Sequence, residues 1–296
     1  MRRGFDSRYP HFNIFNTNMP IILDGKKLSE QAIVRLADDV RALPRQPKLV
    51  IIQIGDVKES NAYINRKKGL AQSVGIAVEH KQYPADVAAA AVIADIGRFN
   101  AEASVDGIMV QLPISEHLNA RDIIASIDEH KDVDGLTPKS SQRMIDDDEL
   151  FLPATTKGII TLLGAYDIPI AGKKAVIVGR SALVGRPTAL AFLNRKATVT
   201  ICHTGTQNLA EETRKADILI VATGRPDLIG VEHVSPGQTV IDVGITVTQD
   251  EGIVGDVDFD AVSSVVGAIT PVPGGIGPMT VLSLMENVVQ AARLHI

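Results

Sequence analysis

Short apolar runs alternate with stretches of helical period along most of the chain. In the first half, strands are expected at residues 49–54, 77–82 and 107–110. The helices between them are expected to begin with a cap at Ser29, to cover residues 60–74, and to run from a cap at Asp86 to Asn100. Repeated strand–helix units of this kind predict a parallel sheet and an α/β fold.

A second set of alternating segments follows an acidic run at residues 146–149. It is expected to open with a helix at 156–166 and to close with a helix at 279–294, whose apolar residues share one face. The strands predicted between these helices are residues 175–178, 198–201, 218–221 and 239–243. The pattern predicts two domains: an N-terminal α/β domain of residues 19–150 and a Rossmann-like domain of residues 151–278.

Residues 1–18 show neither a helical nor a strand period and lack the apolar core of a signal peptide. We expect them to form a disordered extension. Two origins are compatible with this segment. Either Met19 is the biological start and the extension is artefactual or vector-derived, or the segment is a short arm that packs on a partner subunit.

Composition narrows the classes of partner. The 296 residues carry 30 Lys and Arg against 35 Asp and Glu, a formal charge of −5, so no basic footprint for nucleic acid or an anionic membrane is visible. No apolar run approaches the roughly 20 residues that span a bilayer. The single cysteine, Cys202, excludes an intrachain disulfide, and we expect structural roles for Cys202 and His203 rather than metal binding. A small-molecule partner is favoured.

Residues 270–280 combine three prolines with three glycines. Proline fixes φ and removes an N–H group, whereas glycine lets a ligand approach the main chain. The segment therefore predicts a rigid loop, outside any helix or central strand, that suits a flat ligand.

A second glycine-bearing segment follows the strand at 175–178. Gly179 and Gly185 stand where a strand enters a helix, which is typical of a pyrophosphate-binding turn. The spacing departs from Gly-x-Gly-x-x-Gly, so an ordinary tight turn stays open as an alternative. The strand at 198–201 is followed by no acid, while Arg180 and Thr204 offer a cation and a hydroxyl, which favours NADP over NAD.

Tyr63 and Lys67 are four residues apart on a predicted helix, so their side chains project from one face. The alternative for Lys67 is an ordinary solvated charge. The Tyr-x-x-x-Lys spacing also occurs in short-chain dehydrogenases, but there the pair follows the nucleotide turn, whereas here it precedes Gly179. Asp132 and Asp134 lie just before a glycine, and the sequence by itself favours a turn role for them.

Five segments, in this order along the chain, closely resemble the bifunctional methylenetetrahydrofolate dehydrogenase/cyclohydrolase family. They are Tyr63-Ile-Asn-Arg-Lys67, Val110-Gln-Leu-Pro113, Lys131-Asp-Val-Asp-Gly135, residues 176–187 and residues 270–280. The resemblance extends from about Pro20 to Arg293. The chain departs from the family at Ala154 and Thr156, where relatives commonly have Cys and Pro.

The resemblance implies roles for individual residues. Lys67 is then the catalytic lysine, Tyr63 stacks against the substrate, Gln111 positions the lysine, and Asp134 binds the pterin. Further substrate-binding residues that it implies are Val110, Leu112, Pro273, Gly274, Gly275, Ile276 and Gly277. The cofactor-binding residues that it implies are Gly179, Arg180, Ser181, Thr204 and Ile245.

The same resemblance implies a C-terminal helix, residues 279–296, that returns to the N-terminal domain, and a cleft between the two domains. The expected activity is NADP-dependent oxidation of 5,10-methylenetetrahydrofolate and hydrolysis of the methenyl product to 10-formyltetrahydrofolate, by a cytoplasmic homodimer. Two alternatives stay open from sequence: another two-domain NADP dehydrogenase acting on amino or shikimate-type acids, and a catalytically silent folate- or nucleotide-binding protein.

Overall fold

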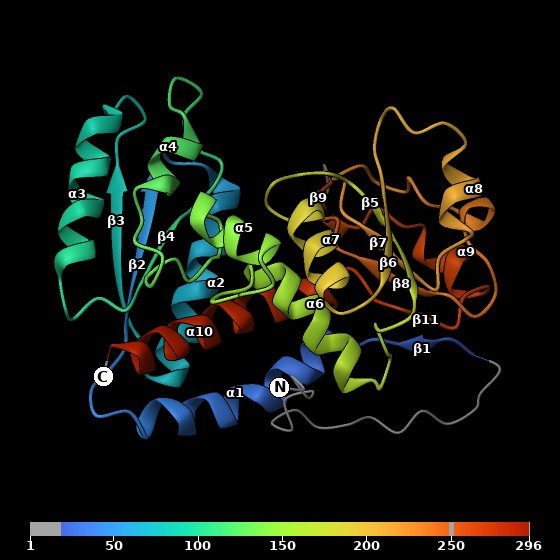
Figure 1. The fold of residues 1–296 in the computed structure, drawn as a ribbon, viewed down its shortest axis with the longest axis horizontal. Helices are drawn as coiled ribbons and strands as arrows, with labels where there is room; N and C mark the ends of the chain where they lie inside the picture. Colours follow the sequence, from blue (N-terminus) through green and yellow to red (C-terminus); the bar gives the residue numbers. More distant parts are fainter. Residues whose placement is uncertain (1–18, 249–251, 296) are drawn as a thin grey trace. The chain divides into compact units, whose positions relative to one another are not determined.

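The computed structural model describes residues 19–248 and 252–295, shown in Figure 1. The expectation of a disordered extension at residues 1–18 lies outside the described residues. The chain forms two compact units. The six-stranded unit holds residues up to Ala32 together with Thr155–Thr280, and the three-stranded unit holds Ile33–Ala154 together with Val281–Ile296. Residues 19–32, expected in the N-terminal domain, thus belong to the six-stranded unit.

The three-stranded unit is built on a parallel sheet with the order β3-β2-β4. Its strands are β2 (Lys48–Ile54), β3 (Ala77–Tyr83) and β4 (Gly107–Val110). Its helices are α2 (Lys58–Val74), α3 (Ala89–Ala101), α4 (Ala120–Ala125) and α5 (Pro138–Ile145). Central β2 is buried along nearly its whole length, and α3 turns Val92, Ile96 and Phe99 into the core. Burial on both faces explains why residues 49–52 of β2 form a continuous apolar run rather than an alternating pattern.

The six-stranded unit has a parallel sheet with the order β1-β11-β8-β7-β5-β6. Its strands are β1 (Ile21–Ile22), β5 (Lys174–Val178), β6 (Thr198–Cys202), β7 (Ile218–Val221), β8 (Thr239–Asp242) and β11 (Ala268–Ile269). Its helical elements are α6 (Ala154–Ala165), which starts at the unit boundary, α7 (Gly185–Asn194), α8 (Leu209–Thr213), η1 (Val231–His233) and α9 (Phe259–Ser263). The parallel α/β fold predicted from the sequence is confirmed.

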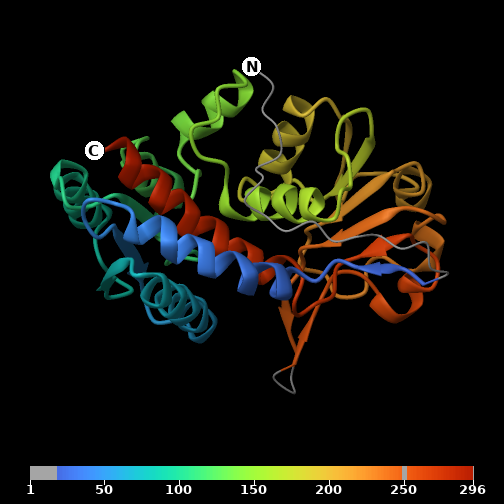
Figure 2. The same ribbon diagram turned by 90° about the horizontal axis from the view of Figure 1, so that it is seen from below.

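Two strands and two helices complete the description. An antiparallel hairpin of β9 (Thr246–Val247) and β10 (Ile253–Val254) projects from the six-stranded unit, as Figure 2 shows. Helices α1 (Gly25–Arg41) and α10 (Ile276–Leu294) each continue from one unit into the other.

The strand order creates a switch point between β5 and β7. From β5 the chain adds β6 on one side, and it then crosses to add β7 and β8 on the other. In doubly wound sheets, ligands bind outside the carboxyl ends of the strands at such a point. The segments that begin at Gly179 and Ala222 leave the sheet there.

Two predicted helix starts are wrong. Helix α1 begins at Gly25, and its first turn is capped by Asp24, whose Oδ1 accepts the Lys27 N–H at 2.8 Å. Ser29 lies inside the helix and donates its hydroxyl to the Lys26 carbonyl instead. Helix α3 begins after Ala88, which provides no side-chain cap. The Ser29 prediction failed because a polar residue near an apolar face resembles a cap whether or not it precedes the helix, whereas Asp86 precedes α3 but is not adjacent to its first residue.

The interpretation that residues 270–280 exclude helix is also wrong in part. Helix α10 begins at Ile276, so that Gly277 and Pro278 occupy its first turn. Proline is tolerated there because the first N–H groups of a helix have no partner within it. The loop proper is therefore residues 270–275.

The start of α1 packs against this loop. The Lys26 N–H donates to the Gly274 carbonyl at 2.8 Å, and the Gly275 N–H donates to the Pro271 carbonyl at 2.8 Å. A Cβ on Gly25 would overlap the carbonyl oxygen of Gly275. The close approach of two main chains thus requires glycine at position 25.

We expect Gly25→Ala to lower the free energy of unfolding by about 1–3 kcal/mol, because the added methyl group meets backbone that cannot rotate away. The matched control is Gly97→Ala in α3, where an added Cβ meets nothing within 4 Å. It should stabilise the protein by about 0.5–1 kcal/mol through helix propensity. Urea denaturation of both variants checks the pair, and equal stabilities would contradict the steric argument.

Candidate functional site

Lys67 is buried in the three-stranded unit, with 9% of its surface exposed. Its Nζ donates to Gln111 Oε1 at 2.8 Å. Gln111 directly follows β4, and its N–H continues the β4 pairing by donating to the Ile52 carbonyl at 2.8 Å. Gln111 Nε2 donates to the Leu112 carbonyl at 2.7 Å, so the amide oxygen is the end that faces the lysine. The sheet therefore presents one oriented acceptor to a buried amine.

Lys67 and Asp134 each shift the pKa of the other against the effect of burial. Burial lowers the pKa of Lys67, and the nearby Asp134 carboxylate partly offsets this. Burial raises the pKa of Asp134, Lys67 works against that shift, and Asp132 adds to it. Residue Asp134 keeps part of its surface exposed, and within the described part of the chain no hydrogen bond reaches its carboxylate. Asp134 is thus available to donors from a ligand.

Tyr63 lies one helical turn before Lys67 on α2 and is half-buried. The Arg66 guanidinium lies 5.8 Å from the centroid of its ring, and burial raises the pKa of the phenol. Val110 is buried at the end of β4, and Leu112 packs against the core. The structure therefore brings Tyr63, Lys67, Gln111 and Asp134 into one unit, as the sequence analysis expected for a common site.

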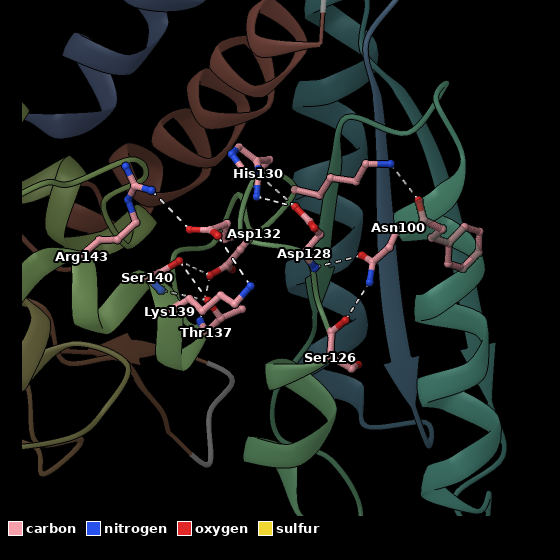
Figure 3. Close-up of polar contacts among 12 residues, drawn as sticks. Asn100, Ser126, Asp128, His130, Asp132, Thr137, Lys139, Ser140 and Arg143 are labelled. Carbon is pink, nitrogen blue, oxygen red and sulfur yellow. Dashed lines mark hydrogen bonds and ion pairs between the residues drawn. The ribbon is translucent and has the colours of Figure 1, made fainter.

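Asp132 and Asp134 have different environments, and Figure 3 shows that of Asp132. Asp132 Oδ2 accepts from the Thr137 N–H at 2.8 Å and from Ser140 Oγ at 2.6 Å, and Oδ1 accepts from the Leu136 N–H at 3.2 Å. These bonds hold the turn and the first residues of α5. The turn role proposed for either aspartate thus belongs to Asp132.

Lys131 also has a structural role that the sequence did not reveal. Its buried Nζ donates to the carbonyls of Phe99, at 3.0 Å, and Glu102, at 2.8 Å, at the end of α3. Cations stabilise helix C-termini, where carbonyl groups lack partners within the helix. Asn100 adds a second link, since its side chain bonds the Ser126 carbonyl and the Asp128 N–H (Figure 3).

The glycine turn of the six-stranded unit fits a pyrophosphate. Gly179 has φ 124°, and a Cβ there would overlap the Ala222 carbonyl. A Cβ on Gly185, the first residue of α7, would overlap the Gly179 carbonyl. Ser181 Oγ accepts from the N–H groups of Val184, at 3.2 Å, and Gly185, at 3.4 Å. The turn therefore brings main-chain groups and the start of a ten-residue helix close together, the usual setting for a phosphate.

The exposed residues beside this turn match a 2′-phosphate better than a free ribose hydroxyl. Arg180 follows β5 and Thr204 follows β6, and these two strands are direct neighbours. Residues 202–206 contain no acid. Ile245 is 38% exposed in the segment after β8. The donor set thus fits a phosphorylated dinucleotide that lies across the carboxyl ends of the strands.

The proline–glycine loop lies in the same unit. Pro273 is exposed and Gly274, at φ 111°, is half-buried, so both are accessible to a ligand. Gly275 and Ile276 are buried, which leaves them roles in packing or through the main chain. Gly277 is half-buried in the first turn of α10.

At Thr156, where relatives commonly have Pro, the side chain forms a polar contact. Thr156 Oγ1 lies 3.0 Å from Thr188 Oγ1 in a buried pair that joins α6 to α7, which lie side by side in Figures 1 and 2.

Within residues 19–248 and 252–295, no cluster of three or more His, Cys, Asp or Glu could hold a metal ion. No helix in the same ranges is long and apolar enough to cross a bilayer.

These features define an α/β protein with a dinucleotide-binding unit and a second unit that carries a buried lysine. Residues 153–296 match the NAD(P)-binding domain of tetrahydrofolate dehydrogenase/cyclohydrolase, and residues 23–134 match its catalytic domain. The chain belongs to the tetrahydrofolate dehydrogenase/cyclohydrolase family.

Three relatives illustrate the match. The bifunctional protein FolD of Methanoculleus marisnigri is 44% identical over 275 residues, which cover 93% of this chain and 97% of the relative. The crystal structure of the bifunctional FolD enzyme of Campylobacter jejuni is 40% identical, with a TM-score of 0.91 over 93% of this chain and 99% of that one. The FolD enzyme of Trypanosoma brucei, solved with NADP and an inhibitor, is 30% identical, with a TM-score of 0.88 over 93% and 98%.

The contrast between the two aspartates gives a stability prediction. Asp132→Ala should lower the free energy of unfolding by about 1–3 kcal/mol, because the buried Ser140 hydroxyl and two N–H groups lose their acceptor. Asp134→Ala, the matched control, should change it by less than about 0.5 kcal/mol, since this carboxylate holds no turn. Denaturant titration of both variants checks the prediction, which a larger loss for Asp134→Ala would contradict.

Proposed function

We propose that this protein oxidises 5,10-methylenetetrahydrofolate to 5,10-methenyltetrahydrofolate with NADP⁺ and hydrolyses that product to 10-formyltetrahydrofolate, as an enzyme of one-carbon metabolism. The observation that carries the proposal is the buried Lys67 amine, bonded to an oriented Gln111 oxygen beside Asp134, in a member of this family. Family membership argues against a dehydrogenase of amino or shikimate-type acids. A complete set of Lys67, Gln111 and Asp134 argues against a silent binding protein.

The oxidation requires positioning more than proton transfer. The reacting carbon lies between two nitrogens, whose lone pairs stabilise the cation left when hydride departs. NADP⁺, when bound, supplies the hydride acceptor. Gly179, Ser181 and the start of α7 would hold its pyrophosphate, and Arg180 and Thr204 its 2′-phosphate. Ile245 would contact it through an exposed apolar side chain.

The folate would be held by its ring. The Asp134 carboxylate can accept paired N–H bonds from the aminopyrimidinone edge, a charge-assisted geometry that fixes orientation. Tyr63 offers a half-buried ring for stacking, and Val110, Leu112 and the accessible part of residues 273–277 would contribute contacts.

Hydrolysis needs a group that moves protons. Water adds to the methenyl carbon and loses one proton, which leaves a hydroxyl group on that carbon. The carbon–N5 bond then breaks as N5 gains a proton and the hydroxyl releases its own proton to solvent, which forms the formyl group. A neutral Lys67 amine can accept the first proton and return it to N5, and burial, which lowers the pKa of Lys67, favours that neutral form. Gln111 accepts one lysine N–H in either state and leaves the nitrogen lone pair free.

We further propose that the enzyme is a cytoplasmic homodimer whose folate domain is the three-stranded unit and whose NADP domain is the six-stranded unit. Family resemblance supports the homodimer, and the single, buried Cys202 is compatible with a reducing compartment. Sedimentation velocity on the purified chain tests the dimer.

Cofactor choice follows from Arg180 and Thr204. Arg180→Ala should weaken NADP⁺ binding by about 1–3 kcal/mol, through loss of a charged hydrogen bond, while NAD⁺ binding changes little. Titration calorimetry with both dinucleotides measures the difference. Equal weakening of both would refute a 2′-phosphate role for Arg180.

Lys67→Gln should abolish hydrolysis more completely than oxidation, so that the methenyl compound accumulates. Glutamine retains a donor and most of the length, so some substrate orientation survives. The measurement is the ratio of NADPH formation to methenyl hydrolysis at saturating substrate, corrected for spontaneous hydrolysis.

The control is Lys68→Gln, which alters the neighbouring lysine that bonds His80 rather than Gln111. It should leave the ratio of the two rates near that of the wild type. Unchanged hydrolysis in Lys67→Gln would rule out Lys67 as the proton-transfer group.

A further inference from the structure

Two buried aspartates lie at the carboxyl edge of the six-stranded sheet and take no part in the mechanism above. Asp242 is the last residue of β8 and is 3% exposed, and Asp256 follows β10 and is 0% exposed. No described Lys, Arg or His forms an ion pair with either of them. Burying a carboxyl group without a cation is costly unless hydrogen bonds satisfy its oxygens.

Each carboxylate binds loop main chain instead. Asp256 Oδ2 accepts the N–H of Thr223 at 2.5 Å, the Thr223 hydroxyl at 2.9 Å, and the Gly224 N–H at 3.0 Å. Asp242 accepts the N–H groups of Gly244 at 2.9 Å, Asp256 at 3.1 Å, and Val257 at 3.0 Å. The first set fixes the segment after β7, and the second ties Gly244, after β8, to residues 256–257, after β10.

Glycines after β8 and β10 allow the main chain to pack closely against the two carboxylates. A Cβ on Gly244 would overlap the Asp256 carboxylate, and a Cβ on Gly255 would overlap that of Asp242. Asp256 Oδ1 is buried without a hydrogen-bond partner among the described residues. Burial, with a contribution from Asp256, raises the pKa of Asp242 to about 6, although three N–H groups oppose the shift. The carboxylates of Asp242 and Asp256 therefore lie close together, and their hydrogen bonds hold the loops after β7 and β8.

The strand order indicates which part of a bound dinucleotide would lie next to these loops. Along the carboxyl edge the order is β6, β5, β7, β8. The 2′-phosphate is assigned to Arg180 and Thr204 after β5 and β6, and the pyrophosphate to the turn after β5. The nicotinamide half must then extend over β7 and β8, where residues 223–225 and 243–245 lie.

We propose that Asp256 and Asp242 are positioning residues that fix these two loops around the nicotinamide half of the dinucleotide. The inference rests on the proposed NADP site. The aspartates touch loop atoms and not the cofactor, so their effect is on how tightly and in which orientation the nicotinamide end is held. The adenosine end depends on β5 and β6 and is left unaffected.

The experiment compares NADP⁺ with 2′,5′-ADP, which carries the adenosine half and the 2′-phosphate but no nicotinamide. Asp256→Asn keeps the shape and makes the acceptor neutral, which weakens the charge-assisted bonds to Thr223 and Gly224. We expect its Kd for NADP⁺ to rise about tenfold, the factor for one weakened bond of this kind, and its Kd for 2′,5′-ADP to stay within about twofold. Calorimetry on the full chain measures both.

Asp258→Asn is the matched control. Asp258 lies two residues further on and caps α9 by accepting the Ala261 N–H at 3.2 Å, so both dissociation constants should stay at wild-type values. Should Asp256→Asn fail to fold, Thr223→Val removes one hydroxyl donor to Asp256 and should show the same selective loss. Equal weakening of the two ligands, or weakening of neither, would overturn the inference. Failure of the wild-type protein to bind either ligand would instead refute the NADP site itself.

Discussion

The hydrogen bond between a buried lysine and a neutral amide is the interaction on which the proposed chemistry of this protein depends. An ammonium group taken out of water tends to lose its proton unless an anion compensates the burial. Gln111 gives Lys67 a partner without giving it a countercharge, and its own orientation is set by the Leu112 carbonyl. The nearest opposing charge, Asp134, is the carboxylate that a bound pterin would engage.

Close approach of main chains is the constraint that shapes the six-stranded unit. Gly25 against the 270–275 loop, and Gly179 against Ala222, are positions where any side chain would overlap backbone. Such contacts cannot be relieved by choosing another rotamer. They hold the loops at the edge of the sheet in fixed positions, and they leave main-chain N–H and C=O groups, rather than flexible side chains, to define the sites.

The sequence predicted those parts of the fold that local pattern determines. Strand β4 was expected at its observed bounds, because it is a short apolar run between turns. Strands β1 and β11 have two residues each, too few to show any period, and they exist only through pairing between distant segments. The start of α10 was placed too late because proline was treated as a helix breaker at a position where it is tolerated.

The same limit applied to the candidate site. Spacing on one helix put Tyr63 and Lys67 together, and resemblance to a family added Gln111 and Asp134. Nothing in the sequence separated Asp132 from Asp134, since the difference lies in which N–H groups fold back on each carboxylate. Asp242 and Asp256 escaped notice for the same reason: their partners lie up to 33 residues away.

The neutrality of Gln111 has a consequence for how two reactions share one pocket. A glutamate in its place would be nearly the same shape, but its charge would lock Lys67 in the ammonium form. Oxidation, which requires only that the substrate be oriented, would tolerate a charged lysine. Ring hydrolysis would lose its base. In the proposed mechanism, the exchange of one amide nitrogen for oxygen would therefore separate a bifunctional catalyst from a simple dehydrogenase, because only a neutral partner leaves Lys67 able to act as a base.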